Sequence, residues 1–418
     1  MSSPVETTAT KDTPPGGTPE DGENGGGIGW AEVLLQAMRS NLRQYGMIVA
    51  LALIIVLFAI WTDGTTVTPT NVTNIITQNG YVFILAIGMM IVIIAGHIDL
   101  SVGSLAAFTG AIAGVLMINH HMAWPLAMAI SLVVGAIAGA WQGFWVAYIG
   151  VPSFIVTLAG MLIFRGGTEI LLKGQSLAPM PEGFTKITSG YLPTVGPNTN
   201  YHNLTLLLGL ALIGWTVFSE WRSRRQQAAY DLDVLPFGLF VLKCVAIGAA
   251  IIAFTMTLAS DQGYPILLLI LAGLLIVFGF VMRNTVIGRH VYALGGNQSA
   301  AKLSGVKSKR VVFLIFVNMG VLAALAGLVA AARLQSATPG AGVNYELEAI
   351  SAAFIGGASS SGGVGTVLGA IIGGLVLGVL NNGMSILSVG SDWQQVIKGL
   401  VLLAAVGFDI YNKRKVGS

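Results

Sequence analysis

The chain has 418 residues, of which 54% are hydrophobic and only 9% are charged. An ordinary soluble domain carries about 25% charged residues, so the composition excludes that class and indicates a polytopic membrane protein. The 55 glycines agree with this, because packed transmembrane helices tolerate glycine better than soluble helices do. The net charge of +3 is too small to suggest a nucleic-acid partner, and none is expected. The single cysteine, Cys244, excludes a disulfide framework within the chain.

The first 45 residues contain no segment long enough to cross a membrane. Residues 1–29 are rich in Gly, Pro, Thr and Glu without apolar periodicity, which predicts a disordered cytoplasmic tail. No cleaved signal peptide is expected, because no short apolar core with a basic flank and a cleavage site precedes the first long apolar run. Leu34, Met38 and Leu42 recur every four residues beside two arginines. This spacing predicts an amphipathic interfacial helix over residues 30–45.

The rest of the chain divides into apolar runs near the length that crosses a hydrocarbon core of about 30 Å. We predict an all-α polytopic fold with about twelve membrane segments, one of them too short to cross by itself. They form a transmembrane domain over residues 46–411, which a short cytoplasmic tail, residues 412–418, follows. The predicted segments are residues 46–61, 81–97, 100–118, 124–148, 152–172, 203–219, 235–258, 265–282, 311–332, 347–357, 364–382 and 393–411.

Basic residues gather in four places, before the first segment, after the sixth, between the eighth and ninth, and at the end of the chain. They are Arg39 and Arg43; Arg222, Arg224 and Arg225; Arg283, Arg289, Lys302, Lys307, Lys309 and Arg310; and Lys413, Arg414 and Lys415. With alternating crossings all four clusters fall on one side, which predicts cytoplasmic termini and a cytoplasmic loop at residues 283–310. Residues 173–200 and 333–346 are then expected outside.

The stretch AGHIDLSVGS, residues 95–104, forms a tight predicted turn between two apolar segments. Irregular polar backbone at membrane depth persists only where protein or water satisfies it, so Asp99 and Ser101 are candidates for the wall of a translocation pathway. The alternative for Asp99 is a cap that places its carboxylate at the start of the next helix. His97 is expected in the core or at an interface rather than as a ligand.

Glycines repeat at four-residue spacing in two of the predicted segments. They are Gly135, Gly139 and Gly143, and Gly365, Gly369 and Gly373. This spacing places them on one helix face and lets another backbone approach closely. Packing within the chain is one interpretation, and contact between the copies of a homodimer is the other.

The basic loop at residues 283–310 contains a short predicted helix. Asn297 or Ser299 can cap a helix whose body is Ala300–Ser304, and Gly305 suits the left-handed position that closes it. A solvated positive-inside loop explains the lysines and arginines, but it does not explain a helix framed by glycines. A second tight turn lies farther along, between residues 347–357 and 364–382, and adds Ser359, Ser360 and Ser361 to the pathway candidates.

The chain has no visible means of hydrolysing ATP. No GxxxxGK[ST] phosphate loop and no metal-ligand motif such as HExxH occurs in it, and no catalytic residue or metal site is expected. Acidic residues within the predicted segments are scarce, which argues against a proton- or sodium-coupled carrier, since such carriers usually need intramembrane carboxylates. The energy for transport would then come from a partner.

Three motifs carry a resemblance to a known family: GHIDLSVGS, IGRHVYALGGNQSAAKLSGV and FIGGASSSGGVGTVLGAIIGGLVLGVLNNG. In this order they resemble the permeases of bacterial ABC importers for monosaccharides, over about residues 45–411. Within them SAAKLSG, residues 299–305, is similar to the EAA-x3-G loop through which such permeases contact their ATPases, with Ser299 in place of Glu. The resemblance implies an ATPase-coupling site at Gly295, Gly296, Asn297, Ser299, Ala300, Ala301, Leu303 and Gly305.

The resemblance also implies a ten-helix core, in which residues 203–219 and 235–258, with the WRSRRQQAAYDLD loop between them, look like an inserted pair. The length of the chain is most similar to the D-xylose-type permeases. The implied protein is a transport subunit, not an enzyme: a homodimer in the lipid of the bacterial inner membrane that translocates a monosaccharide, D-xylose or a related pentose or hexose.

Its implied partners are an ABC-type ATPase, which binds ATP and Mg, and a periplasmic or extracellular sugar-binding protein. No cofactor is expected on this chain. The alternative function is an ATP-independent secondary carrier or facilitator for small polar solutes.

Overall fold

The computed structural model of the protein describes residues 42–197, 201–230 and 236–416. The predicted tail at residues 1–29, and the predicted interfacial helix up to residue 41, lie outside the described residues. Over the described ranges the regular structure is helical, with two isolated backbone bridges, Leu177–Ala337 and Tyr191–Pro265. The all-α prediction is therefore confirmed for this part of the chain.

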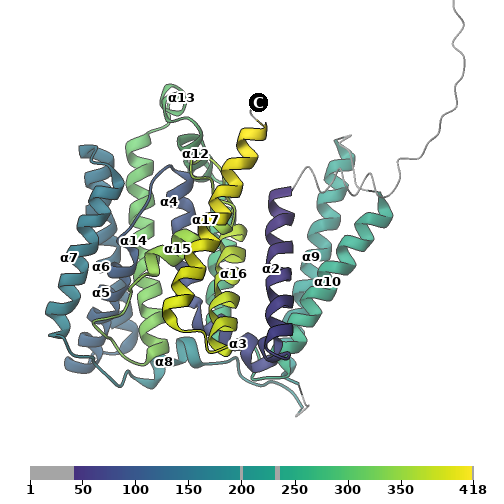
Figure 1. The fold of residues 1–418 in the computed structure, drawn as a ribbon, viewed down its shortest axis with the longest axis horizontal. Helices are drawn as coiled ribbons and strands as arrows, with labels where there is room; N and C mark the ends of the chain where they lie inside the picture. The colour runs from purple at the N-terminus through teal and green to yellow at the C-terminus, as the bar shows by residue number, and fades with distance from the viewer. Residues whose placement is uncertain (1–41, 198–200, 231–235, 417–418) are drawn as a thin grey trace, which may run out of the picture. The chain divides into compact units, whose positions relative to one another are not determined.

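The helices follow the predicted apolar segments closely (Figure 1). In chain order they are α2 (Leu42–Trp61), α3 (Pro69–Gln78), α4 (Gly80–Ile94), α5 (Val102–Gly114), α6 (Trp124–Phe144), α7 (Ser153–Leu172), α8 (Glu182–Ser189), α9 (Asn203–Ala229), α10 (Phe237–Ala259), α11 (Ile266–Asn284), α12 (Val286–Gly296), α13 (Gln298–Leu303), α14 (Ser308–Leu334), α15 (Tyr345–Ile355), α16 (Val367–Ile386) and α17 (Ser391–Val416). A 3-10 turn at Thr65–Val67 precedes α3, and π-helical turns extend α5 to Asn119 and α6 to Ile149.

The described part of the chain contains eight helices long and apolar enough to cross a membrane, or nine if the pair α3 and α4 is one crossing. That pair is bent by 49°, and α3 did not appear among the predicted segments. Helix α15 has 11 residues and is too short to cross alone, as predicted. The helices confirm a polytopic membrane protein, while the count of twelve segments and their sidedness stay predictions.

Two helices run farther than their apolar segments. Helix α9 continues to Ala229, so most of the predicted loop after residue 219 is helical, and α17 continues to Val416, through the predicted C-terminal tail. A segment predicted from hydropathy ends at the first charged residues. The helix itself can continue past that point, because Arg, Gln, Lys and Ala all have high helix propensity.

The first glycine ladder packs within the chain. A Cβ added at Gly135 would lie 2.5 Å from the Gly320 carbonyl oxygen of α14, and one at Gly139 would collide with the Phe316 carbonyl oxygen. The backbones of α6 and α14 therefore touch, and the two helices lie side by side (Figure 1).

In the second set of glycines, Gly369 and Gly373 pack against Ala352 of α15 and against Gly356, the residue that follows this helix. Gly365 lies in the turn before α16 rather than in the helix. These contacts join the short helix α15 to α16 within the chain.

The two predicted sides of the protein correspond to opposite ends of the helices. Helices α12 and α13 lie at one end and α8 at the other (Figure 1). The segments predicted to lie outside meet at the α8 end, where Leu177 and Ala337 exchange backbone hydrogen bonds of 2.9 Å in both directions. The described residues 173–197 and 333–346 thus share one end, opposite α13. Which end faces the cytoplasm stays a prediction.

Candidate coupling and translocation sites

The short helix in the basic loop forms as local sequence rules predict. Asn297 is the residue before α13, and its side-chain oxygen accepts a hydrogen bond of 2.9 Å from the Ala300 N–H. Gly305 follows with φ of +84°, the left-handed backbone that closes the helix. Of the two predicted caps, Ser299 is not one, because it lies inside α13.

Helix α13 is attached on one side and open on the other. Ala301 is buried in the core, and its carbonyl oxygen accepts a hydrogen bond of 3.0 Å from the Val306 N–H. Leu303 is 90% exposed. A single exposed leucine is common on protein surfaces. Leu303, however, is the only large apolar side chain of α13, whose ends are held by the Asn297 cap and by Gly305.

Helix α12 connects this loop to two elements of the core. A Cβ added at Gly295 would collide with the Ile94 carbonyl oxygen at the end of α4. The Gly363 N–H donates to the same oxygen at 2.8 Å, and the Tyr292 hydroxyl donates to the Gly365 carbonyl oxygen at 2.8 Å. We call these five residues the junction, because they join α12 to the end of α4 and to the turn before α16.

Within its turn the Asp99 side chain is buried and hydrogen-bonded. Asp99 Oδ1 accepts hydrogen bonds from the Ser101 N–H at 2.8 Å and the Ser101 hydroxyl at 2.7 Å, and Gln142 Nε2 donates to Ser101 Oγ at 2.6 Å. Helix α5 begins at Val102 without a side-chain cap, so the interpretation of Asp99 as its cap is wrong: the carboxylate closes the turn before the helix. Burial raises the pKa of Asp99 to about 6, against the opposing effect of the two bonds from Ser101.

The second predicted turn is partly open. Ser359 is buried, its hydroxyl lies 2.9 Å from that of Ser361, and it accepts the Ser361 N–H at 3.2 Å. Ser360 and Ser361 are exposed. Through the junction this turn lies beside the end of α4 that leads to Asp99, so the structure brings the two predicted turns to the same end of the molecule, next to α12. Their place in a pathway stays a prediction.

His97, in the first of these turns, contacts an apolar side chain of the core. It is half-buried, and its ring centroid is 5.9 Å from that of Phe316 on α14. The contact is with an apolar ring, which agrees with a position in the core rather than a ligand role.

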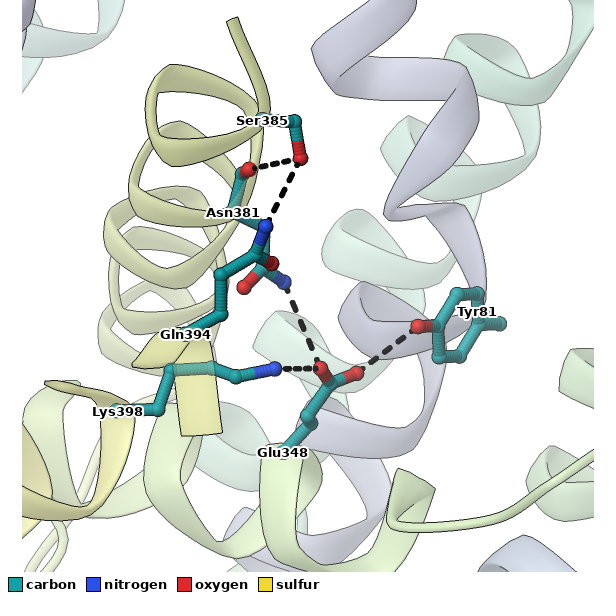
Figure 2. Close-up of polar contacts among 6 residues, drawn as sticks. All are labelled: Tyr81, Glu348, Asn381, Ser385, Gln394 and Lys398. Carbon is teal, nitrogen blue, oxygen red and sulfur yellow. Dashed lines mark hydrogen bonds and ion pairs between the residues drawn. The ribbon is translucent and has the colours of Figure 1, made fainter. Parts of the chain in front are cut away.

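Sequence reasoning missed a polar cluster at the other end of α4 (Figure 2). Glu348 of α15 accepts hydrogen bonds from Lys398 Nζ of α17 at 2.9 Å and from the Tyr81 hydroxyl of α4 at 2.9 Å. Asn381 Nδ2 of α16 lies 3.5 Å from the same carboxylate. The side chains of Lys398 and Glu348 are 22% and 12% exposed. We call the residues in Figure 2 the Glu348 cluster: Tyr81, Glu348, Asn381, Ser385, Gln394 and Lys398.

The signal for this cluster was present in the sequence. Glu348 and Lys398 both fall within predicted membrane segments, 347–357 and 393–411. The expectation that acidic residues are scarce there therefore overlooked one that is central. Ionisable residues at membrane depth usually pair with one another, and pairing the charges across segments would have suggested this contact.

Comparisons with known proteins match nearly the whole chain. The family model described as "Branched-chain amino acid transport system / permease component" matches residues 71–406. The chain belongs to this permease family. The matched range includes both polar turns, α12, α13 and all of the Glu348 cluster.

Similar permeases in curated collections have names that refer to sugars. The "Xylose transport system permease protein XylH" of Haemophilus influenzae is 41% identical over 383 residues, which are 90% of this chain and 98% of the relative. The protein of the same name from Escherichia coli K12 is 40% identical over 377 residues, 90% of this chain and 93% of the relative. The "Ribose import permease protein RbsC" of E. coli K12 is 33% identical over 351 residues, 83% of this chain and 87% of the relative. No solved structure matches the chain. These matches confirm the resemblance that the three motifs indicate.

Proposed function

We propose that this chain is the permease subunit of an ATP-driven importer that moves D-xylose, or a closely related pentose, across the bacterial inner membrane. The observation that carries the proposal is the 40–41% identity to xylose permeases over 90% of the chain. The chain is a transport subunit rather than an enzyme. We propose two copies of it in the transporter, with a separate ATPase that binds ATP and Mg and a sugar-binding protein on the outer side.

The coupling site in this proposal is α13. An ATPase that binds Leu303 contacts a short helix whose two ends are fixed by Asn297 and Gly305. A movement of the ATPase therefore displaces α13 as one rigid unit. The motion passes to α12 and across the junction, where the backbones of Gly295 and Gly363 contact the Ile94 carbonyl oxygen directly. Helix α4, which has 15 residues and is about 22 Å long, then carries the motion toward the opposite end.

A second function is favoured by one observation. Glu348 is a carboxylate at membrane depth, which proton- and sodium-coupled carriers need. In this chain, however, the carboxylate is already bound by Lys398 at 2.9 Å, so it is not free to take up an ion in the described arrangement. The family match and the Glu348–Lys398 pair together favour the ATP-driven importer.

Reconstitution distinguishes the two functions. The permease is placed in liposomes alone, and also with the ATPase and sugar-binding protein of the same transporter. Uptake of labelled D-xylose is followed with and without ATP. We expect uptake only with all components and ATP. Uptake by the permease alone, driven by an ion gradient or by the sugar gradient, would overturn the proposal in favour of a carrier or facilitator.

A further inference from the structure

Two discontinuous membrane segments meet at the Glu348 cluster. Helices α3 and α4 form a pair bent by 49°, and Tyr81 is the second residue after the break. Helix α15 has only 11 residues, and Glu348 lies in its first turn. Interrupted helices within a membrane occur where they line a solute site or are covered by protein. The cluster therefore has the backbone setting of a solute site.

The charges of the cluster face the interior of the protein rather than its surface, because the side chains of Lys398 and Glu348 are largely buried. Lys398 is about 10 Å along α17 from the start of the helix at Ser391. Neighbouring side chains on the other face of α17, Trp393, Leu400 and Leu403, are each more than half exposed. Lys398 thus points inward to the Glu348 carboxylate, from a helix whose opposite face exposes large apolar side chains. An ionisable pair in this position is costly to maintain and normally has a function.

The cluster also has hydrogen-bonding capacity that the described residues do not use. Asn381 Oδ1 is buried and has no partner among them. On another face of α15, Glu346 is 8% exposed and its Oε2 likewise lacks a partner. Buried polar atoms are almost always hydrogen-bonded in native proteins. Two unused acceptors on or beside one short helix point to a ligand that donates hydrogen bonds.

We propose that the Glu348 cluster is the place where the permease itself contacts the transported sugar, an inference that rests on the proposed function for the class of solute. A sugar hydroxyl is both donor and acceptor. It can donate to the Glu348 carboxylate and to Asn381 Oδ1, and it can accept from Lys398 Nζ and from the Tyr81 hydroxyl. The ring of Tyr345 stacks on that of Tyr81 with centroids 3.9 Å apart, which holds the Tyr81 hydroxyl in position.

The described arrangement is the closed form of this site. In it the cluster's side chains bind one another, and both Lys398 and Tyr81 donate hydrogen bonds to the Glu348 carboxylate. Opening requires α17 to separate from α15. Helices α4 and α16 run from the cluster to the junction, so motion at α13 reaches both sides of the site. The sugar replaces the contact between Glu348 and Lys398 when the site opens.

The test uses the complete transporter in liposomes, with the ATPase and sugar-binding protein held constant. Tyr81→Phe removes one hydroxyl, and Glu348→Gln removes one charge. The matched control is Glu220→Gln, in the ion pair of Glu220 with Lys243 (2.8 Å) that links α9 and α10 away from the cluster. Uptake, sugar-stimulated ATP hydrolysis, and selectivity between D-xylose and analogues that each lack one hydroxyl are measured for every variant.

We expect Tyr81→Phe and Glu348→Gln to lower uptake at least tenfold, with stimulated ATP hydrolysis within about twofold of the parent. A site built to bind a hydroxyl rejects the analogue that lacks it, so Tyr81→Phe should also reduce discrimination against one deoxy analogue about tenfold. Glu220→Gln should change none of these. The selectivity measurement separates sugar contact from a structural role, since loss of packing alone does not alter the preference among hydroxyl positions.

The double variant Glu348→Lys with Lys398→Glu tests the alternative that the ion pair has only a structural role. If the pair only fastens α17 to α15, the exchange restores uptake and parental selectivity, and the proposal is overturned. Parental selectivity in Tyr81→Phe would also overturn it, even if Glu348→Gln fails to assemble. Failure of the proposed function looks different, because the parent complex itself would then show no ATP-dependent uptake.

Discussion

The two ends of α4 contact their neighbours by different means. At the junction, Ile94 meets Gly295 and Gly363 through backbone atoms, without an intervening side chain. At the other end, Tyr81 meets Glu348 through a hydroxyl and a carboxylate, within a cluster that includes a lysine. Backbone contact resists any added atom and transmits displacement, whereas polar side chains can exchange partners. Helix α4 thus connects a rigid backbone contact at one end to a polar side-chain cluster, which can exchange hydrogen-bond partners, at the other.

The largest effect is expected where backbones touch. Gly295→Ala should prevent stable folding, because the added methyl collides with the Ile94 carbonyl oxygen and neither backbone can move without displacing its helix. Gly296→Ala is the matched control, since a Cβ there meets nothing within 4 Å. The yield of monodisperse protein in detergent measures both. Equal yields would show that the junction is more compliant than these contacts imply.

In the Glu348–Lys398 ion pair, replacing one residue should lower the stability of the permease more than replacing both. Glu348→Leu leaves Lys398 largely buried and unpaired, which typically costs about 3–5 kcal/mol for a buried pair. The double variant Glu348→Leu with Lys398→Met should recover much of the lost thermal stability in detergent. Glu220→Leu, in a pair whose side chains are 38% and 33% exposed, should cost about 1 kcal/mol or less. A double variant as unstable as Glu348→Leu would contradict the assignment of the loss to an unpaired charge.

The turn beside the junction should respond to pH. The pKa of Asp99 is raised by burial from 3.8 to about 6 in the folded protein. The stabilising contribution of its protonated form is therefore complete below pH 3.8 and is lost as the pH rises through about 6. Asp99→Asn keeps an oxygen for the bonds from Ser101 and cannot ionise. Relative to the parent, its free energy of unfolding should therefore be higher at pH 8 than at pH 4 by up to about 3 kcal/mol. Thermal unfolding at the two pH values measures this, and a pH-independent difference would show that Asp99 is not held in a raised-pKa state.

A smaller effect is expected from the cap of α13. Asn297→Ala removes the bond to the Ala300 N–H, and loss of such a cap costs about 1 kcal/mol. The affinity for the ATPase should fall about fivefold, as measured by titration in detergent. Ser299→Ala is the control, because Ser299 lies inside the helix, and it should bind as the parent does. Equal affinities in the two variants would mean that the partner does not require a preformed α13.

What the sequence predicts well in this chain is local. Apolar runs place most helix ends within a few residues, and cap rules identify Asn297 and Gly305 around α13. Helix α3 was missed because PTNVTNIITQ is short and polar, and its packing rather than its hydropathy makes it a helix. The contacts that matter most join distant residues: Ile94 with Gly363, and Glu348 with Lys398. No local pattern encodes such pairs, and only the packing of the helices brings them together.

The most direct test of the account is the Leu303→Asp variant in the complete transporter. Leu303 is 90% exposed, so the substitution should leave the yield, thermal stability and membrane insertion of the permease unchanged. We predict that it abolishes co-purification of the ATPase and all sugar-stimulated ATP hydrolysis, because an unpaired carboxylate would enter an apolar contact, while Leu303→Met retains both. If the Leu303→Asp complex assembles and hydrolyses ATP in response to sugar as the parent does, α13 is not the coupling element.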